Sequence, residues 1–184
     1  MEDGASGQGE CDGNYTTKSA YSVIFAGGND SAAVQRPSEL NARVWKTPAP
    51  QKTIVTAWRL LKNRLATCDN LEKRKVMLGD EEVKCKFCNS QKETIDHLFL
   101  LCPKTADLWD EIQKWLGFTT VRTNTARRHF ESFAHLESGK KNRRFLLMVW
   151  VCSIWMVWRR RNECRFGNDV WDCKTILSEI KVRT

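Results

Sequence analysis

The sequence has no apolar run long enough to cross a lipid bilayer. Its longest such run, FLLMVWVCSIWMVW at residues 145–158, holds fourteen residues, one of them serine, with arginines on both sides. A membrane-spanning helix needs about 20 apolar residues, and shorter runs are typical of buried core helices. We therefore expect a core helix at this position and no membrane partner.

The first ten residues, MEDGASGQGE, likewise lack the apolar stretch of a secretory signal peptide. We expect an intracellular chain, in the nucleus or the cytoplasm, with a disordered tail over residues 1–11. In a reducing compartment, the eight cysteines are expected as thiols or metal ligands and not as disulfides.

Signals of catalysis are also missing. We find no nucleophile beside a base, no metal site with an open position and no glycine-rich phosphate loop. These absences argue against an enzyme and leave binding or structural roles.

Positive charge is abundant, with a formal net charge of +8 and a pI near 9.2. An excess of this size favours an anionic partner, with RNA or single-stranded DNA first. The candidate phosphate contacts flank the long apolar run: Arg143, Arg144, Arg159, Arg160, Arg161 and Arg165. The alternative is that these arginines form only a solvated rim. Trp150, Trp155 and Trp158 are expected in the core and not as platforms for unpaired bases.

Hydrophobic periodicity predicts a mainly α fold. One apolar face follows Pro50 and comprises Ile54, Val55, Trp58, Leu61 and Leu65. Thr67 is the expected N-cap of a short helix through Lys75. A second amphipathic helix should end at Gly117, and further helices are predicted at residues 125–137, 141–165 and 170–181. Strand is expected only as short pieces near the N-terminus and around Cys85, and residues 26–39 are read as a linker.

The most informative stretch is CKFCNSQKETIDHLFLLC at residues 85–102. Cys85 and Cys88 have the C-x2-C spacing of a metal knuckle, His97 follows nine residues later, and Cys102 follows five after that. Three cysteines and one histidine complete the tetrahedral ligand set of a structural zinc ion and leave no position for a reactive water. Two alternatives are ordinary buried cysteines beside an unrelated histidine, or a redox-active cysteine pair.

Helix geometry makes it difficult for His97 and Cys102 to bind the same ion. Residues five apart on an α-helix point about 140° away from each other, so His97 and Cys102 cannot share one continuous helical face. Pro103 biases Cys102 out of the helical region and can itself begin the next helix. We therefore expect Thr94 to cap a helix that carries His97, and the chain to bend at Cys102. Elsewhere, Cys152 is expected in the core, while His129 and His135 are expected at the surface.

Three stretches together suggest a family. They are DGNYTTKSAY at residues 12–21, VWKTPAPQKTIVTAWRLLKNRLATCDNL at residues 44–71 and the cysteine–histidine stretch at residues 85–102. Trp109 and the later IWMVWRRRNECRF at residues 154–166 extend the pattern. The sequence resembles the zinc-binding domain that lies downstream of the reverse transcriptase in plant LINE-type (non-LTR) retrotransposons.

The resemblance implies a zinc-binding domain over residues 12–116, with residues 117–184 as a helical extension packed on it. It implies one structural Zn²⁺ and a place beside nucleic acid in the replication of a mobile element. It does not imply polymerase activity, because the [YF]-x-D-D motif of the catalytic module is absent, as are endonuclease and ribonuclease H signatures. We expect a domesticated fragment or a decayed copy of such an element. The alternative function is a zinc-stabilised helical remnant that binds protein or has no role.

Overall fold

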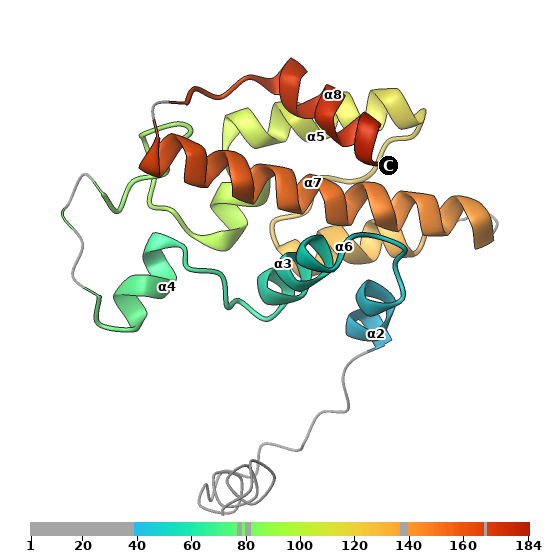
Figure 1. Cartoon of the computed structure of the whole chain (residues 1–184), viewed down its shortest axis with the longest axis horizontal. Coiled ribbons are helices and arrows are strands. Elements are labelled where there is room, and N and C mark those ends of the chain that lie inside the picture. Colours follow the sequence, from blue (N-terminus) through green and yellow to red (C-terminus); the bar gives the residue numbers. More distant parts are fainter. Residues whose placement is uncertain (1–38, 77–78, 80–81, 137–139, 168) are drawn as a thin grey trace, which may run out of the picture. The chain divides into compact units, whose positions relative to one another are not determined.

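The computed structural model describes residues 39–76, 79, 82–136, 140–167 and 169–184, and these residues are mainly helical (Figure 1). The helices are α2 (Glu39–Trp45), α3 (Gln51–Leu61), α4 (Cys68–Lys73), the π-helix η1 (His97–Leu101), α5 (Pro103–Leu116), α6 (Ala126–Ala134), α7 (Lys140–Phe166) and α8 (Cys173–Arg183). The only β pairing among the described residues is an isolated antiparallel bridge between Lys84 and Lys92. The mainly α prediction is confirmed. The tail and the opening stretch at residues 12–21 lie outside the described residues.

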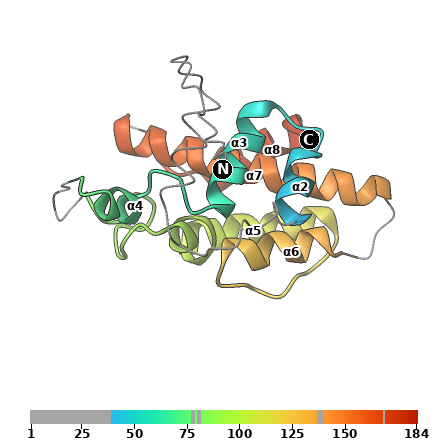
Figure 2. The ribbon, with the colours of Figure 1, turned by 90° about the horizontal axis from the view of Figure 1, so that it is seen from below.

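Helix α7 is the centre of the packing. It contacts α3, α6 and α8, and Figure 2 shows α3 on one side of it with α5 and α6 on the other. Val149, Trp150, Val151 and Ile154 are fully buried. Because neighbours surround it, the helix is apolar on most of its faces. No helix in the described part of the chain has both the length and the apolar character that a membrane crossing requires.

Aromatic rings fill the space between α5, α6 and α7. Trp109 lies edge-on to His129 and Phe133, and Phe130 packs against Trp150. The Trp109 indole Nε1 donates to the backbone oxygen of Phe99 at 2.8 Å. This bond satisfies the one polar atom of the ring and ties α5 to η1.

His129 corrects the expectation that it lies at the surface. It is 4% exposed, and its Nδ1 accepts a hydrogen bond from Trp150 Nε1 at 3.0 Å. Burial lowers its pKa to about 4, so the ring is neutral near pH 7. His135 is exposed and Cys152 is buried, as predicted.

The predicted helices are present, but their first and last residues differ from the predicted ones. Gly117 ends α5 in the left-handed conformation with φ of 72°, as its position predicted. Helix α2 was not predicted, and only its first residue, Glu39, belongs to the predicted linker at residues 26–39. In α3 the buried face includes Thr53 and Thr56, which the predicted apolar face did not contain. Both hydroxyls donate to backbone oxygens within the first turns, and this removes the cost of burying them.

Candidate metal centre

Cys85 and Cys88, the first two of the predicted metal ligands, lie in a tight turn beside the Lys84–Lys92 bridge. The Cys85 N–H donates to the Gln91 oxygen at 2.8 Å, and the Asn89 N–H donates back to the Cys85 oxygen at 2.8 Å. Asn89 takes the left-handed conformation with φ of 52°, which asparagine tolerates better than most residues. The turn thereby folds Cys88 back toward Cys85.

The second pair is brought together by the π-helix. The Cys102 N–H donates to the His97 oxygen at 2.7 Å, the i to i+5 bond that defines this helix type. Five residues therefore make about one turn, and His97 and Cys102 come to the same side of the chain. Cys102 itself has extended backbone (φ −64°, ψ 130°), and Pro103 begins α5. The expected bend is present, and the π turn was the missing part of the explanation.

A cap holds the start of this segment. The His97 N–H donates to the Thr94 hydroxyl at 3.1 Å, as expected for an N-cap residue. Leu98, Phe99 and Leu100 are buried behind the turn, so packing fixes the orientation of the whole π-helix. The histidine is thus held by its backbone as well as by its own burial.

The four side chains converge. The ligand atoms of Cys85, Cys88, His97 and Cys102, hereafter the Cys3His cluster, all lie within 4.8 Å of one another. The Cys85 and Cys102 sulfurs are 4.0 Å apart, and Cys88 Sγ is 3.3 Å from His97 Nε2. Around a tetrahedral zinc ion, two sulfurs are about 3.8 Å apart, and a sulfur and a nitrogen are about 3.5 Å apart. The donor set and its spacing fit a metal ion of this kind.

The protonation states also suit a metal ion. The hydrogen bond from the Cys85 thiol lowers the pKa of Cys102, and the N–H groups of Lys104 and Thr105 at the start of α5 lower it further. The same contact, together with burial, raises the pKa of Cys85. Burial lowers the pKa of His97 and favours the neutral imidazole that metals bind. Cys102 therefore has a lower pKa than Cys85 and ionises more readily than it does.

The structure also distinguishes the two nitrogens of His97. Nε2 faces the sulfur of Cys88, so this is the nitrogen that could bind a metal ion together with the three sulfurs. Nδ1 is buried, and no described residue forms a hydrogen bond with it. All four donors come from the protein, three of them buried and Cys88 half-buried, which leaves no open coordination position for chemistry.

Comparison with known proteins agrees with this geometry. A family model described as zinc-binding in reverse transcriptase matches residues 15–109, just over half of the chain. The chain belongs to this family. No curated protein and no solved structure matches significantly. The matched segment contains the whole Cys3His cluster and ends before α6, α7 and α8.

One residue from beyond the family match reaches the cluster region. Arg161, on α7, is 2% exposed, and its Nη2 and Nε lie 2.5 Å and 3.0 Å from the two carboxylate oxygens of Glu93. Glu93 is fully buried and lies in the chain between Cys88 and His97. The pair therefore connects α7 to the segment that carries the metal ligands.

Glu93 has a second task at the start of α4. Its Oε1 accepts from the Cys68 N–H at 3.2 Å, and its backbone oxygen accepts from the Asp69 N–H at 3.2 Å. Thr67 occupies the predicted N-cap position, but its hydroxyl makes no capping bond. The carboxylate of Glu93 accepts a hydrogen bond at the start of α4 in place of the Thr67 hydroxyl, and a negative group is favourable at a helix N-terminus. Sequence analysis did not predict this role of Glu93.

The six arginines predicted as phosphate contacts differ in burial and in their ion pairs. Arg161 is buried against Glu93, and Arg160, at 9% exposed, pairs with Asp169 at 2.5 Å. In both cases a carboxylate already pairs with the arginine. Glu93 lies far from Arg161 in the sequence, while Asp169 follows just after the end of α7. Arg165 is half-buried and donates to the Cys68 sulfur and to the Glu82 oxygen, both at 3.0 Å.

Three of the six remain exposed. Arg159 pairs with Glu163 at 2.7 Å, while Arg143 and Arg144 lie at the start of α7 without an ion pair to any described residue. Of the tryptophans, Trp150 is fully buried as expected. Trp155 and Trp158 are only half-buried against the core.

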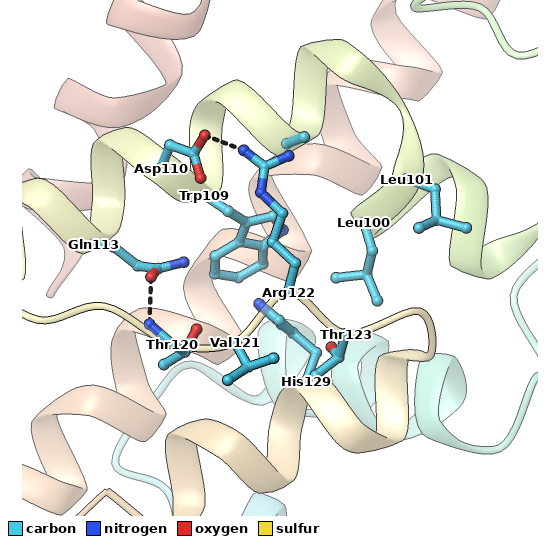
Figure 3. Close-up of a pocket in the computed structure, with 11 residues that line it drawn as sticks. Leu100, Leu101, Trp109, Asp110, Gln113, Thr120, Val121, Arg122, Thr123 and His129 are labelled. Carbon is cyan, nitrogen blue, oxygen red and sulfur yellow. Dashed lines mark hydrogen bonds and ion pairs between the residues drawn. The ribbon is translucent and has the colours of Figure 1, made fainter.

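A separate pocket lies between α5 and the segment before α6 (Figure 3). Its volume is about 130 Å³, and Trp109 and His129 form part of its wall. Arg122 pairs with Asp110 at 2.5 Å across it, and Gln113 accepts from the Thr120 N–H at 2.7 Å (Figure 3). None of the four Cys3His residues lines it, so it is not part of the metal centre.

Proposed function

We propose that the Cys3His cluster binds one structural Zn²⁺ and that this member of the family is a non-catalytic module that contacts nucleic acid. The observation that carries the zinc proposal is the closed set of four donors at tetrahedral spacing. When bound, the ion stabilises residues 85–102 by joining the knuckle to the π turn. It offers no site for a substrate, because protein atoms fill every position.

The proposal that the chain is not catalytic is also supported by its sequence. It contains no [YF]-x-D-D motif, and the family match covers a zinc-binding domain and no catalytic one. We expect the purified chain to show no polymerase or nuclease turnover on RNA or DNA. Turnover that co-purifies with the chain and disappears with a point substitution in it would contradict this proposal.

Nucleic-acid contact is supported by the net charge of +8 and by exposed cations on several helices. Phosphate contacts release counterions, so binding must weaken steeply as salt rises. The test is a gel-shift titration with single-stranded RNA and single-stranded DNA at about 50 and 200 mM salt. Absence of binding at the lower salt would favour the alternative of a protein-binding remnant.

We further propose an origin in a plant LINE-type element and an intracellular location. The origin is supported by the resemblance of residues 12–21, 44–71 and 154–166 to that group. The location is supported by the three cysteine ligands, since zinc binding requires reduced thiolates. Reverse-transcriptase remnants in the genomic sequence upstream would support the origin, and a clean unrelated sequence there would contradict it.

A further inference from the structure

The stretch from the second residue of α2 to the end of α3 has cations and no anions. Residues 40–68 include Arg43, Lys46, Lys52, Arg59, Lys62 and Arg64, and neither aspartate nor glutamate. All except Arg43 are exposed, and none of the six forms an ion pair with a described residue. Their charge is therefore not neutralised within the described fold, unlike that of the α7 residues Arg159, Arg160 and Arg161.

Two of these cations, Lys52 and Arg59, lie on α3, and a third, Lys62, is its C-cap. Lys52, Arg59 and Lys62 lie at positions i, i+7 and i+10, which at about 100° per residue places them within about 80° around the helix axis. The buried face of α3, which includes Ile54, Ala57 and Leu60, points away from them. The three side chains hence form one exposed stripe, here called the α3 stripe.

Aromatic rings lie next to this stripe, on α7. Trp155, Trp158 and Phe166 line a shallow surface hollow of about 530 Å³, and Phe166 is 80% exposed. Their spacing of three and eight residues keeps them on one side of the helix. A large exposed ring is costly to leave in water, which makes this hollow a candidate contact surface.

The stripe and the hollow meet at one contact. The Lys52 ammonium lies 5.4 Å from the centre of the Trp155 ring, and α3 packs directly against α7 (Figure 1). A cation at the edge of an aromatic surface is the arrangement with which proteins hold unpaired nucleotides. The phosphate meets the cation while the base stacks on the ring.

We propose that the α3 stripe and the α7 hollow together bind single-stranded nucleic acid, with phosphates on Lys52, Arg59 and Lys62 and bases on Trp155 and Phe166. This inference rests on the proposed nucleic-acid function and gives it a site. Of the six α7 arginines predicted as phosphate contacts, Arg159 alone lines the hollow. The bases of a duplex are stacked on each other and cannot reach the aromatic side chains of the hollow. We therefore expect single strands to bind more tightly than duplex.

The test compares two triple variants that lose the same charge. The first is Lys52→Gln/Arg59→Gln/Lys62→Gln. The control is Lys114→Gln/Arg122→Gln/Arg127→Gln, three exposed cations that are paired with Glu111, Asp110 and Glu131. Binding of single-stranded RNA and of DNA is measured by fluorescence anisotropy over a range of salt. We expect the α3 triple to lose at least about tenfold in affinity and to lower the salt slope by about 2, and the control to change affinity less than about threefold.

The aromatic contact has its own variant. Phe166→Ala removes an exposed ring, so the fold should persist, and we expect about a tenfold loss of single-strand affinity with an unchanged salt slope. A circular-dichroism melt confirms that each variant is folded.

The outcomes separate the two proposals. If the wild type binds with strong salt dependence but the α3 triple binds equally well, the site is wrong and the proposed function stands. If the wild type binds no single strand at low salt, or binds only anionic phospholipid vesicles, both proposals are wrong. Equal losses in the α3 triple and the control would show that net charge, and not this surface, governs binding.

Discussion

Arg161 is a buried cation whose charge is balanced by one carboxylate, that of Glu93. The net gain from such a pair is small, because both groups lose their hydration, but removing one partner leaves the other charged and buried. The two residues lie far apart in the sequence, so their pairing could not be predicted from spacing. Sequence reasoning accordingly placed Arg161 at a phosphate, since arginine beside an apolar run is most often exposed.

We predict that Arg161→Met destabilises the fold by about 3–5 kcal/mol, because Glu93 is then buried without its partner. The double variant Glu93→Gln/Arg161→Met should recover a large part of that loss. Urea unfolding followed by circular dichroism measures both. The matched control is Arg122→Gln, which removes an exposed pair with Asp110 and should cost less than about 1 kcal/mol. Equal effects of the buried and exposed substitutions would contradict the prediction.

His129 makes a prediction about pH. Its pKa is about 4 in the folded chain, because the ring is buried, against an ordinary value of 6.5 when unfolded. Below pH 6.5 the unfolded chain binds a proton that the folded chain does not, so stability falls as pH falls from 6.5 to 4, by about 3 kcal/mol from this residue. Above pH 6.5 this residue contributes no pH dependence.

The comparison that isolates this contribution is His129→Gln, whose amide oxygen can still accept from Trp150 Nε1. The free energy of unfolding is measured by urea titration at several pH values from 4 to 8 for both proteins. We expect the variant to lose less stability than the wild type between pH 6.5 and 4. Parallel curves would show that His129 is not the group responsible.

The ligand residues themselves were predicted from spacing alone. We expect Cys88→Ser and His97→Ala each to reduce the zinc content from one per chain to nearly none. Much of residues 80–105 should unfold as well, because the free energy of metal binding is also folding free energy in a site of this kind. Metal analysis and a thermal melt are the measurements. Cys173→Ser serves as the control, and a ligand variant that melts like this control and retains its zinc would be inconsistent with the Cys3His cluster.

At the scale of elements, sequence analysis did not predict that η1 is a π-helix. The pattern of HLFLL suits an α-helix as well as a π-helix, and only the i to i+5 bond between His97 and Cys102 distinguishes them. The bend at Cys102 was predictable, since proline restricts the residue before it. The π turn was not, because it depends on tertiary packing of Leu98 and Phe99.

This element offers a sharp test. Deleting Leu101, which is 52% exposed, shortens the π turn by one residue and should restore α-helical spacing between His97 and the cysteine that follows. Four positions on an α-helix span about 400°, so the histidine and the cysteine still lie only about 40° apart, and the deletion variant should hold close to one zinc per chain. Leu101→Ala keeps the chain length and should bind zinc normally. A deletion variant that loses its zinc would show that the Cys3His cluster depends on the π turn itself and not only on the side of the chain that the two ligands share.

For the whole molecule, the family match and the packing suggest different boundaries. The match ends at Trp109, and the predicted domain ended at residue 116, yet α7 supplies Arg161 and much of the buried core. Helices α3 and α6 both pack against α7, and α5 packs against α8. Sequence periodicity predicted these helices well, but the partners of a helix cannot be read from its own pattern.

We therefore predict that a chain ending at residue 116 unfolds without cooperativity and binds zinc at least tenfold more weakly than the full chain. Its apolar faces lose their partners, and Glu93 loses Arg161. Thermal melts and competition with a chelator measure the two effects. A truncated chain that melts sharply and holds zinc as tightly as the full chain would restore the predicted domain boundary.

X-ray absorption at the zinc edge of the purified full chain tests the central claim most directly, since it reports both the metal and its ligands. The Cys3His cluster predicts three sulfurs at about 2.3 Å and one nitrogen at about 2.0–2.1 Å from the ion. A zinc signal dominated by oxygen ligands, or a chain purified intact and folded without zinc, would contradict the account.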